Sequence, residues 1–466
     1  MNHALALFKT TWTPIQIAKR SHPYAVSFRH FLQNQPTTQY FRMQNGITVA
    51  TEERECYNVC VGLYMDAGSR YESSFENGMA HFFEHIAFKS TKTRNRTTLE
   101  EQMACIGAKF GCFTDREMAA YHVECLCQDT PLALDLLTDC VLNNAFSVPD
   151  IECQKRTVYS EMLEHDKDSN GLVFDYLHST AFQGTPLAKT VMGPTCNLYN
   201  FSDATICNYI SKYFDPCRMV LAGVGGIKHE QLVCLAQAYL SKFEPVKCID
   251  NDVYRYTGSE VRFRDDSLPL ANAIIAVEGP CFCAPDNVVM EIAAAVVGGW
   301  DRSQPGGENH PTRLARKASS CHVCDSYRAF NLNYKDTGLW GVQFVAPSLC
   351  LEDMTYMIQN EWMELCNTVT DAEVERAKRE LKAKWLSKME SSSKACHDIG
   401  RWVLYNGERP SLLERLCTID NVRATDVRDV CTKYVYDRCP AVAGVGFLTR
   451  GIYTAEIIRL IFLPDC

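Results

Sequence analysis

Two histidines and a glutamate near the start of the chain have the spacing of a zinc-binding helix. The stretch GMAHFFEHIAF, residues 78–88, places His81 and His85 four residues apart and Glu84 directly before the second histidine. On a helix, residues four apart lie on one face about one turn apart, so both imidazoles could reach one metal ion. Glu84 neighbours that face and could take a proton from a water held by the metal.

Two histidines do not complete a catalytic zinc site, which needs three protein ligands and an open position for water. The segment VYSEMLEHD offers Glu161, Glu164 and His165 on a second expected helix. The residues alone leave open which of the three binds. They also leave open that HxxEH belongs to an ordinary buried helix without a metal.

The elements that must hold these residues alternate between strands and helices. Alternating apolar residues predict strands, and longer amphipathic segments predict helices. We expect strands within 46–53, 57–68, 108–127 and 218–227, and helices at 77–88, 131–143 and 148–165. This mixed order predicts an α+β fold with helices packed on a largely antiparallel sheet.

The same unit is present twice. KYFDPCRMVLAGVG, from Lys212 to Gly225, matches KYVYDRCPAVAGVG, which begins 221 positions later and ends at Gly446. Nearer the front of each copy the offset falls to about 211, which matches Gly68 with Gly279. We therefore expect two homologous domains.

The second copy lacks the metal-site residues. Its three histidines, His310, His322 and His397, are not paired on a helix, and the offset of 221 puts Lys382 opposite Glu161. It also carries about ten extra residues between positions 298 and 321. Only the first copy is equipped for metal.

The copies divide the chain into a leader at 1–40, a first domain at 41–242, a linker at 243–256 and a second domain at 257–466. The leader contains Lys9, Lys19, Arg20 and Arg29, and the first acidic residue is Glu52. A basic segment without acidic residues is typical of a mitochondrial transit peptide. The alternative is a disordered basic arm.

Composition excludes two broad classes of protein. A formal net charge of −9 argues against nucleic-acid binding and suits a basic partner. No apolar run is long enough to predict a membrane span. The 24 cysteines are scattered, and the single CxxC, Cys321 to Cys324, has no second pair at zinc-ribbon spacing.

The chain resembles the pitrilysin (inverzincin) family, whose HxxEH reverses the commoner HExxH. The resemblance rests on the segments DAGSRYESSFENGMAHFFEHIAFKSTKTR, VFDYLHSTAFQGTPLAKTVMGPT, RDDSLPLANAIIAVEGP, YKDTGLWG and VCTKYVYDRCPAVAGVG. Within the family the chain is similar to two groups, the β subunits of mitochondrial processing peptidase and the core 1 subunits of ubiquinol–cytochrome c reductase. The resemblance implies two homologous α/β sandwich domains that enclose a cavity.

The resemblance also implies roles for particular residues. It places His81, His85 and Glu161 on Zn²⁺, with Glu84 as general base. Asp175 matches one of two acidic positions associated with binding the arginine of a presequence.

Three positions depart from the pattern of the processing peptidases. Gln154 stands where a further glutamate is usual, seven residues before Glu161. Gly111 replaces an asparagine in the strand that pairs with extended substrate. Gly171 replaces the second of the acidic residues. These changes weaken the expected support of the metal and the recognition of substrate.

Two functions follow from the resemblance. The first is a zinc metalloendopeptidase that removes basic presequences from imported precursors, paired with an α-type homologous subunit as a heterodimer. The second is a largely non-catalytic core 1-type subunit of the respiratory chain, paired with a core 2-type subunit and other subunits of the complex. Both imply the mitochondrial matrix or the matrix face of the inner membrane. The set His81, Glu84, His85 and Glu161 favours the peptidase.

Overall fold

The computed structural model describes residues 36–243 and 254–447, and the described residues from Thr37 onwards form one compact unit. The predicted leader at 1–40 and the linker at 243–256 lie mostly outside the described residues. No helix among the described residues combines the length and the apolar character that a membrane crossing needs.

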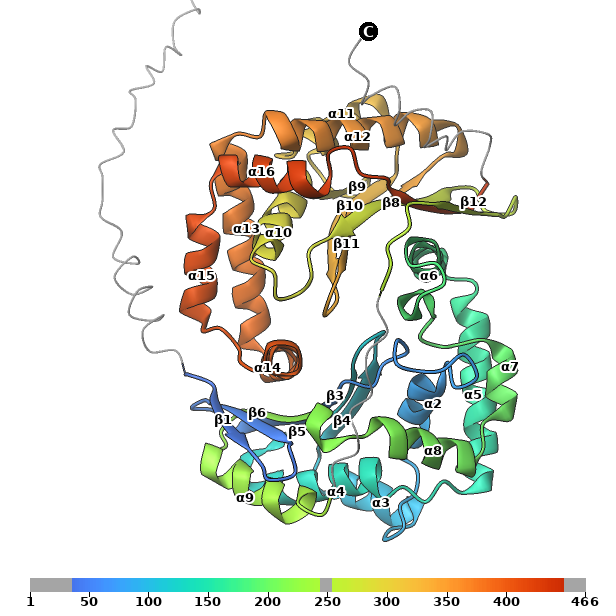
Figure 1. Cartoon of the computed structure of the whole chain (residues 1–466), viewed down its shortest axis with the longest axis vertical. Helices are drawn as coiled ribbons and strands as arrows, with labels where there is room; N and C mark the ends of the chain where they lie inside the picture. The colour runs from blue at the N-terminus through green and yellow to red at the C-terminus, as the bar shows by residue number, and fades with distance from the viewer. Residues whose placement is uncertain (1–35, 244–253, 448–466) are drawn as a thin grey trace, which may run out of the picture. The chain divides into compact units, whose positions relative to one another are not determined.

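The first half contains a six-stranded sheet (Figure 1). Its strands are β1 (Gln39–Arg42), β2 (Thr48–Glu53), β3 (Asn58–Met65), β4 (Lys109–Thr114), β5 (Ala119–Leu126) and β6 (Met219–Gly225). They lie in the order β1-β2-β6-β3-β5-β4. Only β2 and β6 pair in parallel. The predicted largely antiparallel sheet is therefore confirmed.

Helices complete this half. They are α2 (Met79–Ile86), α3 (Arg96–Cys105), α4 (Thr130–Leu142), α5 (Val148–His165), α6 (Ser169–Ala181), α7 (Thr195–Asn200), α8 (Asp203–Tyr213) and α9 (His229–Leu240). Apolar side chains of α2, α4, α5, α8 and α9 form one core with the strands. The amphipathic spacing of these helices explains why they cover the sheet.

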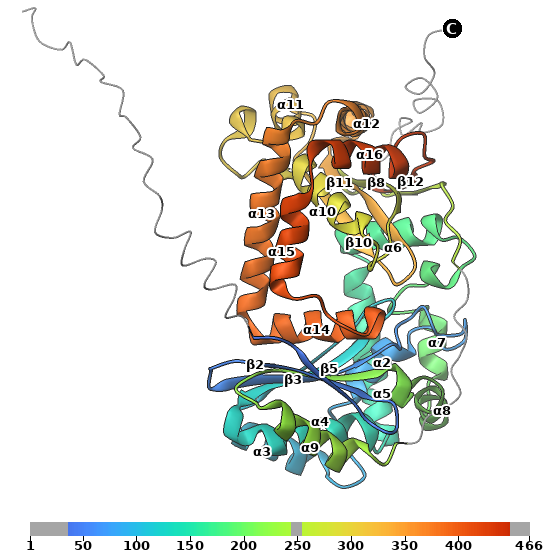
Figure 2. The ribbon, with the colours of Figure 1, turned by 60° about the vertical axis from the view of Figure 1, so that its left-hand side comes forward.

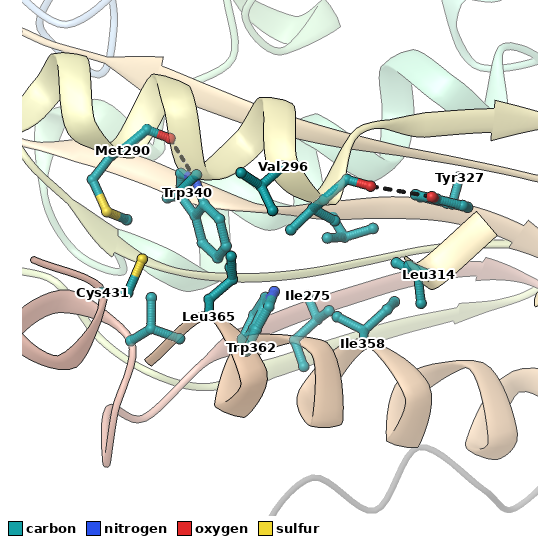
Figure 3. Packing of buried hydrophobic residues seen from close by; sticks show 14 of the residues in the cluster. Ile275, Met290, Val296, Leu314, Tyr327, Trp340, Ile358, Trp362, Leu365 and Cys431 are labelled. Atoms are coloured by element: carbon teal, nitrogen blue, oxygen red, sulfur yellow. Dashed lines mark hydrogen bonds between the residues drawn. The ribbon is translucent and has the colours of Figure 1, made fainter. Parts of the chain in front are cut away.

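The second half repeats this plan. Its strands are β7 (Glu260–Arg264), β8 (Ala271–Gly279), β9 (Gly299–Asp301), β10 (Ser326–Asn333), β11 (Gly338–Ala346) and β12 (Ala441–Gly446), in the order β7-β12-β8-β11-β10-β9. Its helices are α10 (Asp286–Val297), α11 (Arg313–Cys321), α12 (Leu351–Asn367), α13 (Asp371–Glu390), α14 (Ser392–Asn406), α15 (Leu412–Asn421) and α16 (Ala424–Tyr434). Figure 3 shows the core, where the Trp340 indole donates to Met290 O over 3.1 Å.

The two halves share their topology, which confirms two homologous α+β domains. In the first half the last strand, β6, runs parallel to β2 and antiparallel to β3. In the second half the last strand, β12, runs parallel to β7 and antiparallel to β8. Gly225 and Gly446, matched by the offset of 221, end these strands at φ values of 131° and 123°. Only glycine adopts such values readily, so both copies keep it.

The halves exchange one helix each. Helix α6 of the first half packs on β8 and β12 of the second sheet, and α14 of the second half packs on β3 and β6 of the first (Figure 1). Figure 2 shows α14 lying across the strands of the first half. The approach is close at Gly400, where a Cβ would lie 2.4 Å from the ring of Tyr64. The exchange ties the two domains together.

The structure corrects the predicted match between α5, which carries Glu161, and its counterpart α13 in the second half. Ser147 caps α5 and Thr370 caps α13, which gives an offset of 370 − 147 = 223 rather than 221. The difference arises because α12 has 17 residues and α4 has 13, while the loop after α12 is two residues shorter. Glu161 therefore lies opposite Lys384, not Lys382.

The offset is also different for α2 and α10. Residues 81–87 and 291–297 show the same order of half-buried and buried positions, so the offset is 291 − 81 = 210. Glu291 is therefore the counterpart of His81. Residues 294 and 295, both alanine, are the counterparts of Glu84 and His85.

Candidate metal centre

Helix α2 holds the HxxEH residues against the core. Met79, Phe82, Phe83 and Ile86 are buried beneath it, which leaves the face with the two histidines half-buried. The chain enters the helix through Gly78 at φ 97°, a conformation that suits glycine.

A carboxylate that sequence reasoning missed fixes the start of α2. Glu72 is 1% exposed and accepts hydrogen bonds from the Ala80 N–H at 2.6 Å and the Gly78 N–H at 2.9 Å. The Asn77 amide donates to it as well, at 2.9 Å. Burial raises the pKa of Glu72 to about 7, although these donors oppose the shift. The absence of an ordinary cap residue at position 78 was the signal that another acceptor was needed.

Helix α5 supplies the third residue. Ser147 accepts from the Asp150 N–H at 3.3 Å and caps this helix. Ile151, Val158 and Met162 are buried in the core, so Glu161 stands on the flank that faces α2. The two helices pack directly on each other.

The structure brings His81, His85 and Glu161 together. Glu161 Oε2 lies 2.9 Å from His85 Nε2 and 3.4 Å from His81 Nε2. The imidazole centroids are 4.9 Å apart at an interplanar angle of 76°. Within residues 36–243 and 254–447, this is the one group of three His, Cys, Asp or Glu residues whose ligand atoms all lie within 4.8 Å of one another.

Glu84 lies beside this group and not within it. Its Oε2 is 3.8 Å from His81 Nδ1, on the other side of that ring from Glu161. Burial tends to raise the pKa of Glu84, but the neighbouring His81 imidazole and Thr114 hydroxyl outweigh it and lower the pKa. Glu84 is therefore an ionised carboxylate that can accept a proton.

The two imidazoles differ in their electrostatics. Burial disfavours the charged form of His81, but the carboxylates of Glu84 and Glu161 outweigh it and raise its pKa. Burial and the neighbouring charge of His81 lower the pKa of His85. The carboxylates of Glu84 and Glu161 favour a positive charge at His81. A bound cation would supply that charge in place of a proton on the imidazole.

The residues fit a zinc ion. His81 Nε2 is buried and has no hydrogen-bond partner among the described residues, which is costly for a polar atom unless something else binds it. Two imidazole nitrogens and one carboxylate are the donor set of many catalytic zinc sites. Glu164 is exposed and His165 bonds elsewhere, so Glu161 is the candidate that the fold selects.

Asp175, the predicted residue for substrate arginine, is already paired. Its Oδ1 accepts from Arg116 Nη2 at 2.5 Å, and its Oδ2 lies 2.9 Å from His165 Nε2. Its role as a substrate ligand remains a prediction. A substrate arginine would have to compete with Arg116 for this carboxylate.

Two of the three departures have local explanations. At Gly111 a Cβ would lie 2.7 Å from the ring of His122, and at Gly171 a Cβ would lie 2.6 Å from the ring of His165. The imidazole rings have thus taken the space of the missing side chains. Gln154 is buried on α5, two turns before Glu161.

Comparisons with known proteins agree with this site. The model of the insulinase family (peptidase family M16) matches residues 48–195, and the model of the M16 inactive domain matches residues 200–381. The first match contains all four site residues. The second match covers most of the second half of the chain, which lacks these residues.

Two groups of relatives are similar to nearly the whole chain. Cytochrome b-c1 complex subunit 1 of Mus musculus is 40% identical over 94% of this chain and 92% of its own length. The β subunit of the mitochondrial-processing peptidase of Bos taurus is 39% identical over 89% of this chain and 85% of its own. A chain of complex III2 from Candida albicans, with Inz-5 bound, has a TM-score of 0.82 at 26% identity and covers 90% of this chain and 99% of its own.

Proposed function

Because the chain belongs to peptidase family M16, we propose that it is the zinc-binding subunit of a metalloendopeptidase of the mitochondrial processing type. It removes basic presequences from precursors imported into the matrix. The observation that carries this proposal is the convergence of His81, His85 and Glu161, with Glu84 beside them, where His81 Nε2 makes no hydrogen bond among the described residues.

The residues of the site have distinct tasks. His81, His85 and Glu161 hold the zinc, which would supply a polarised scissile carbonyl and an acidified water. Glu84 orients that water and accepts its proton, then passes the proton to the leaving amine. Thr114 at the end of β4 and His81 keep the Glu84 carboxylate ionised for this step.

The substrate lies along the edge of the first sheet. Within the described part of the chain, strand β4 pairs only with β5, so its outer edge is open to an extended peptide. Asp175 at 19% exposure binds an arginine of the presequence, and the net charge of −9 attracts basic peptides. An α-type homologous subunit completes the enzyme.

A second candidate is a core subunit of the respiratory complex with little proteolysis. It is favoured by the 40% identity to cytochrome b-c1 complex subunit 1 and by the fold match to a complex III2 chain. The filling of the Gly111 and Gly171 positions by imidazole rings also favours it, because both positions belong to substrate recognition. This role places the chain on the matrix face of the inner membrane with a core 2-type partner.

One experiment separates the two. The chain is co-expressed with an α-type subunit, and zinc content and cleavage of a presequence peptide are measured for the wild type and for Glu84→Gln. We expect zinc in both proteins and a rate at least about 10²-fold lower in Glu84→Gln, the usual contribution of a general base. Glu164→Gln, on the exposed side of α5, is the matched control. Zinc without cleavage that depends on Glu84 would leave the core subunit as the function.

A further inference from the structure

The second half contains a cavity where the first half contains the metal site. The cavity has a volume of about 700 Å³. Its walls include the four residues that the helix offsets of 210 and 223 place opposite the metal-site residues: Glu291, Ala294, Ala295 and Lys384. The repeat has therefore kept the position of the site and changed its chemistry.

This cavity cannot copy the metal site. Alanine offers no ligand at two of the four positions, and Lys384 puts a positive charge where Glu161 puts a negative one. Lys388, one turn further along α13, lines the same cavity. The chemistry of these residues suits an anion rather than a cation.

The basic groups of the wall are available for a ligand, whereas the acidic groups are engaged. Lys384 and Lys388 form no hydrogen bond or ion pair with another described residue, although both act on the charge of Glu291. Glu380 pairs with Arg376 at 3.2 Å, and Asp301 accepts from the Ser303 hydroxyl at 2.5 Å.

Glu291 is the exception among the acidic groups. Its Oε2 is buried without a partner among the described residues. Burial raises the pKa of Glu291, although Arg415 and the two lysines, Lys388 and Lys384, oppose the shift. Glu291 therefore contributes a buried oxygen that makes no hydrogen bond among the described residues.

An open strand edge runs along the same cavity. Strand β10 pairs with β9 only from Ser326 to Arg328, while it pairs with β11 as far as Asn333. The hairpin bond from Tyr334 N–H to Thr337 O at 2.8 Å sets the alternation of the ladder. Asn331 therefore turns its N–H and C=O to the outer edge, beside Glu291 in the cavity wall.

A second cavity of about 480 Å³ leads from this edge to the first half. It shares Glu291, Asn331 and Lys388 with the larger cavity. Its other wall includes Thr114 and Arg116, at the end of the edge strand β4 of the first half. A peptide that leaves β4 can thus enter the second half without crossing the core.

We propose that the second half binds an extended peptide segment that carries a carboxylate. The peptide main chain pairs with β10 at Asn331, and its carboxylate lies between Lys384 and Lys388. The carboxylate belongs to an acidic side chain or to a chain end. This binding is independent of the proposed peptidase activity, because no metal ligand takes part.

The test uses the full chain with its partner subunit and a zinc chelator, so that no cleavage occurs. The probe is a fluorescein-labelled peptide of alternating threonine and valine with one central glutamate, and its twin carries glutamine instead. By fluorescence anisotropy we expect the glutamate peptide to bind about tenfold more tightly, the effect of one charge-assisted hydrogen-bonded contact. Lys384→Glu with Lys388→Glu should abolish this preference.

Two controls keep the test decisive. Arg379→Glu changes the charge of the same helix on its exposed face, outside the cavity, and should leave the preference intact. If the double reversal lowers the melting temperature, Lys384→Gln with Lys388→Gln replaces it. Equal affinity for the two peptides, no binding of either, or the same loss in Arg379→Glu would overturn the proposal.

Discussion

The helix pairs α2/α5 and α10/α13 present the same backbone framework with opposite chemistry. Both pairs bury the same pattern of apolar positions, and both leave a few half-buried positions toward the space between the helices. In the first pair these positions carry two imidazoles and two carboxylates. In the second, Glu291 and two alanines occupy the half-buried positions, and Lys384 stands at an exposed position. The comparison teaches that the fold fixes where a site lies, while side-chain type at a few positions decides what it binds.

The largest effect, on zinc affinity, should come from replacing Glu161 of the first half by lysine, the residue at the matching position of the second half. Glu161→Lys removes one proposed ligand and adds a positive charge beside the two histidines. We expect zinc affinity to fall more than about a hundredfold, beyond the 10–100-fold loss typical of residues that only support a ligand. Metal analysis after dialysis against buffered zinc measures this. Glu164→Lys, on the exposed side of the same helix, should retain zinc, and full zinc in Glu161→Lys would exclude Glu161 as a ligand.

The reverse exchange should create a site in the second half. The triple variant Glu291→His, Ala295→His and Lys384→Glu copies the three proposed ligands onto the matching positions of α10 and α13. We expect a second zinc ion per chain, bound about 10–100-fold more weakly because supporting residues are missing. Zinc stoichiometry by mass spectrometry tests this, with Lys384→Glu alone as control. A stoichiometry unchanged from the wild type would show that the two helix pairs are not equivalent in geometry.

The sequence predicts the parts of this comparison that depend on local spacing. His81 and His85 follow from helical periodicity, and the duplicated fold follows from repeated strand endings such as Gly225 and Gly446. The choice of Glu161 over its neighbours came only from the family resemblance, because spacing along a helix does not show which flank faces another helix. The match of Glu161 with Lys384 was missed, because a longer helix and a shorter loop change the offset by two without leaving a motif.

Other features depend on contacts between distant residues. Glu72 caps α2 from six residues before its N-cap, Gly78, and Asp175 accepts from Arg116 of another segment. The exchange of α6 and α14 is equally non-local, since each helix packs on the sheet of the other copy. No periodicity within either helix indicates which sheet it will cover.

The exchange itself can be tested at its closest point. Gly400→Ala on α14 places a methyl group 2.4 Å from the ring of Tyr64, so the helix must move away from the first sheet. We expect a loss of about 1–3 kcal/mol in the free energy of unfolding, the usual cost of overpacking. Lys394→Ala, at an exposed position of the same helix, should change it by less than about 0.5 kcal/mol. Chemical denaturation of both variants gives the comparison.

The smallest effect concerns a histidine on each exchanged helix. His178 of α6 bonds through Nε2 to the Tyr334 hydroxyl at 2.5 Å, and His397 of α14 bonds through Nδ1 to the Tyr64 hydroxyl at 2.8 Å. Burial lowers the pKa of both, and the nearby His122 helps to lower the pKa of His397 to about 4. Both therefore resist protonation in the folded state.

The sign of the pH dependence follows from these lowered values. The unfolded chain protonates His397 near its ordinary pKa of 6.5, so its contribution to stability is complete above that pH and is lost as the pH falls toward about 4. We expect the wild type to lose about 1–2 kcal/mol more between pH 7 and pH 4.5 than His397→Gln, a figure reduced for partial solvent screening. Denaturant titrations at the two pH values measure the difference. An equal loss in His397→Gln would mean that α14 is held on the first sheet without regard to this imidazole, and the same measurement on His178→Gln then shows whether α6 behaves alike.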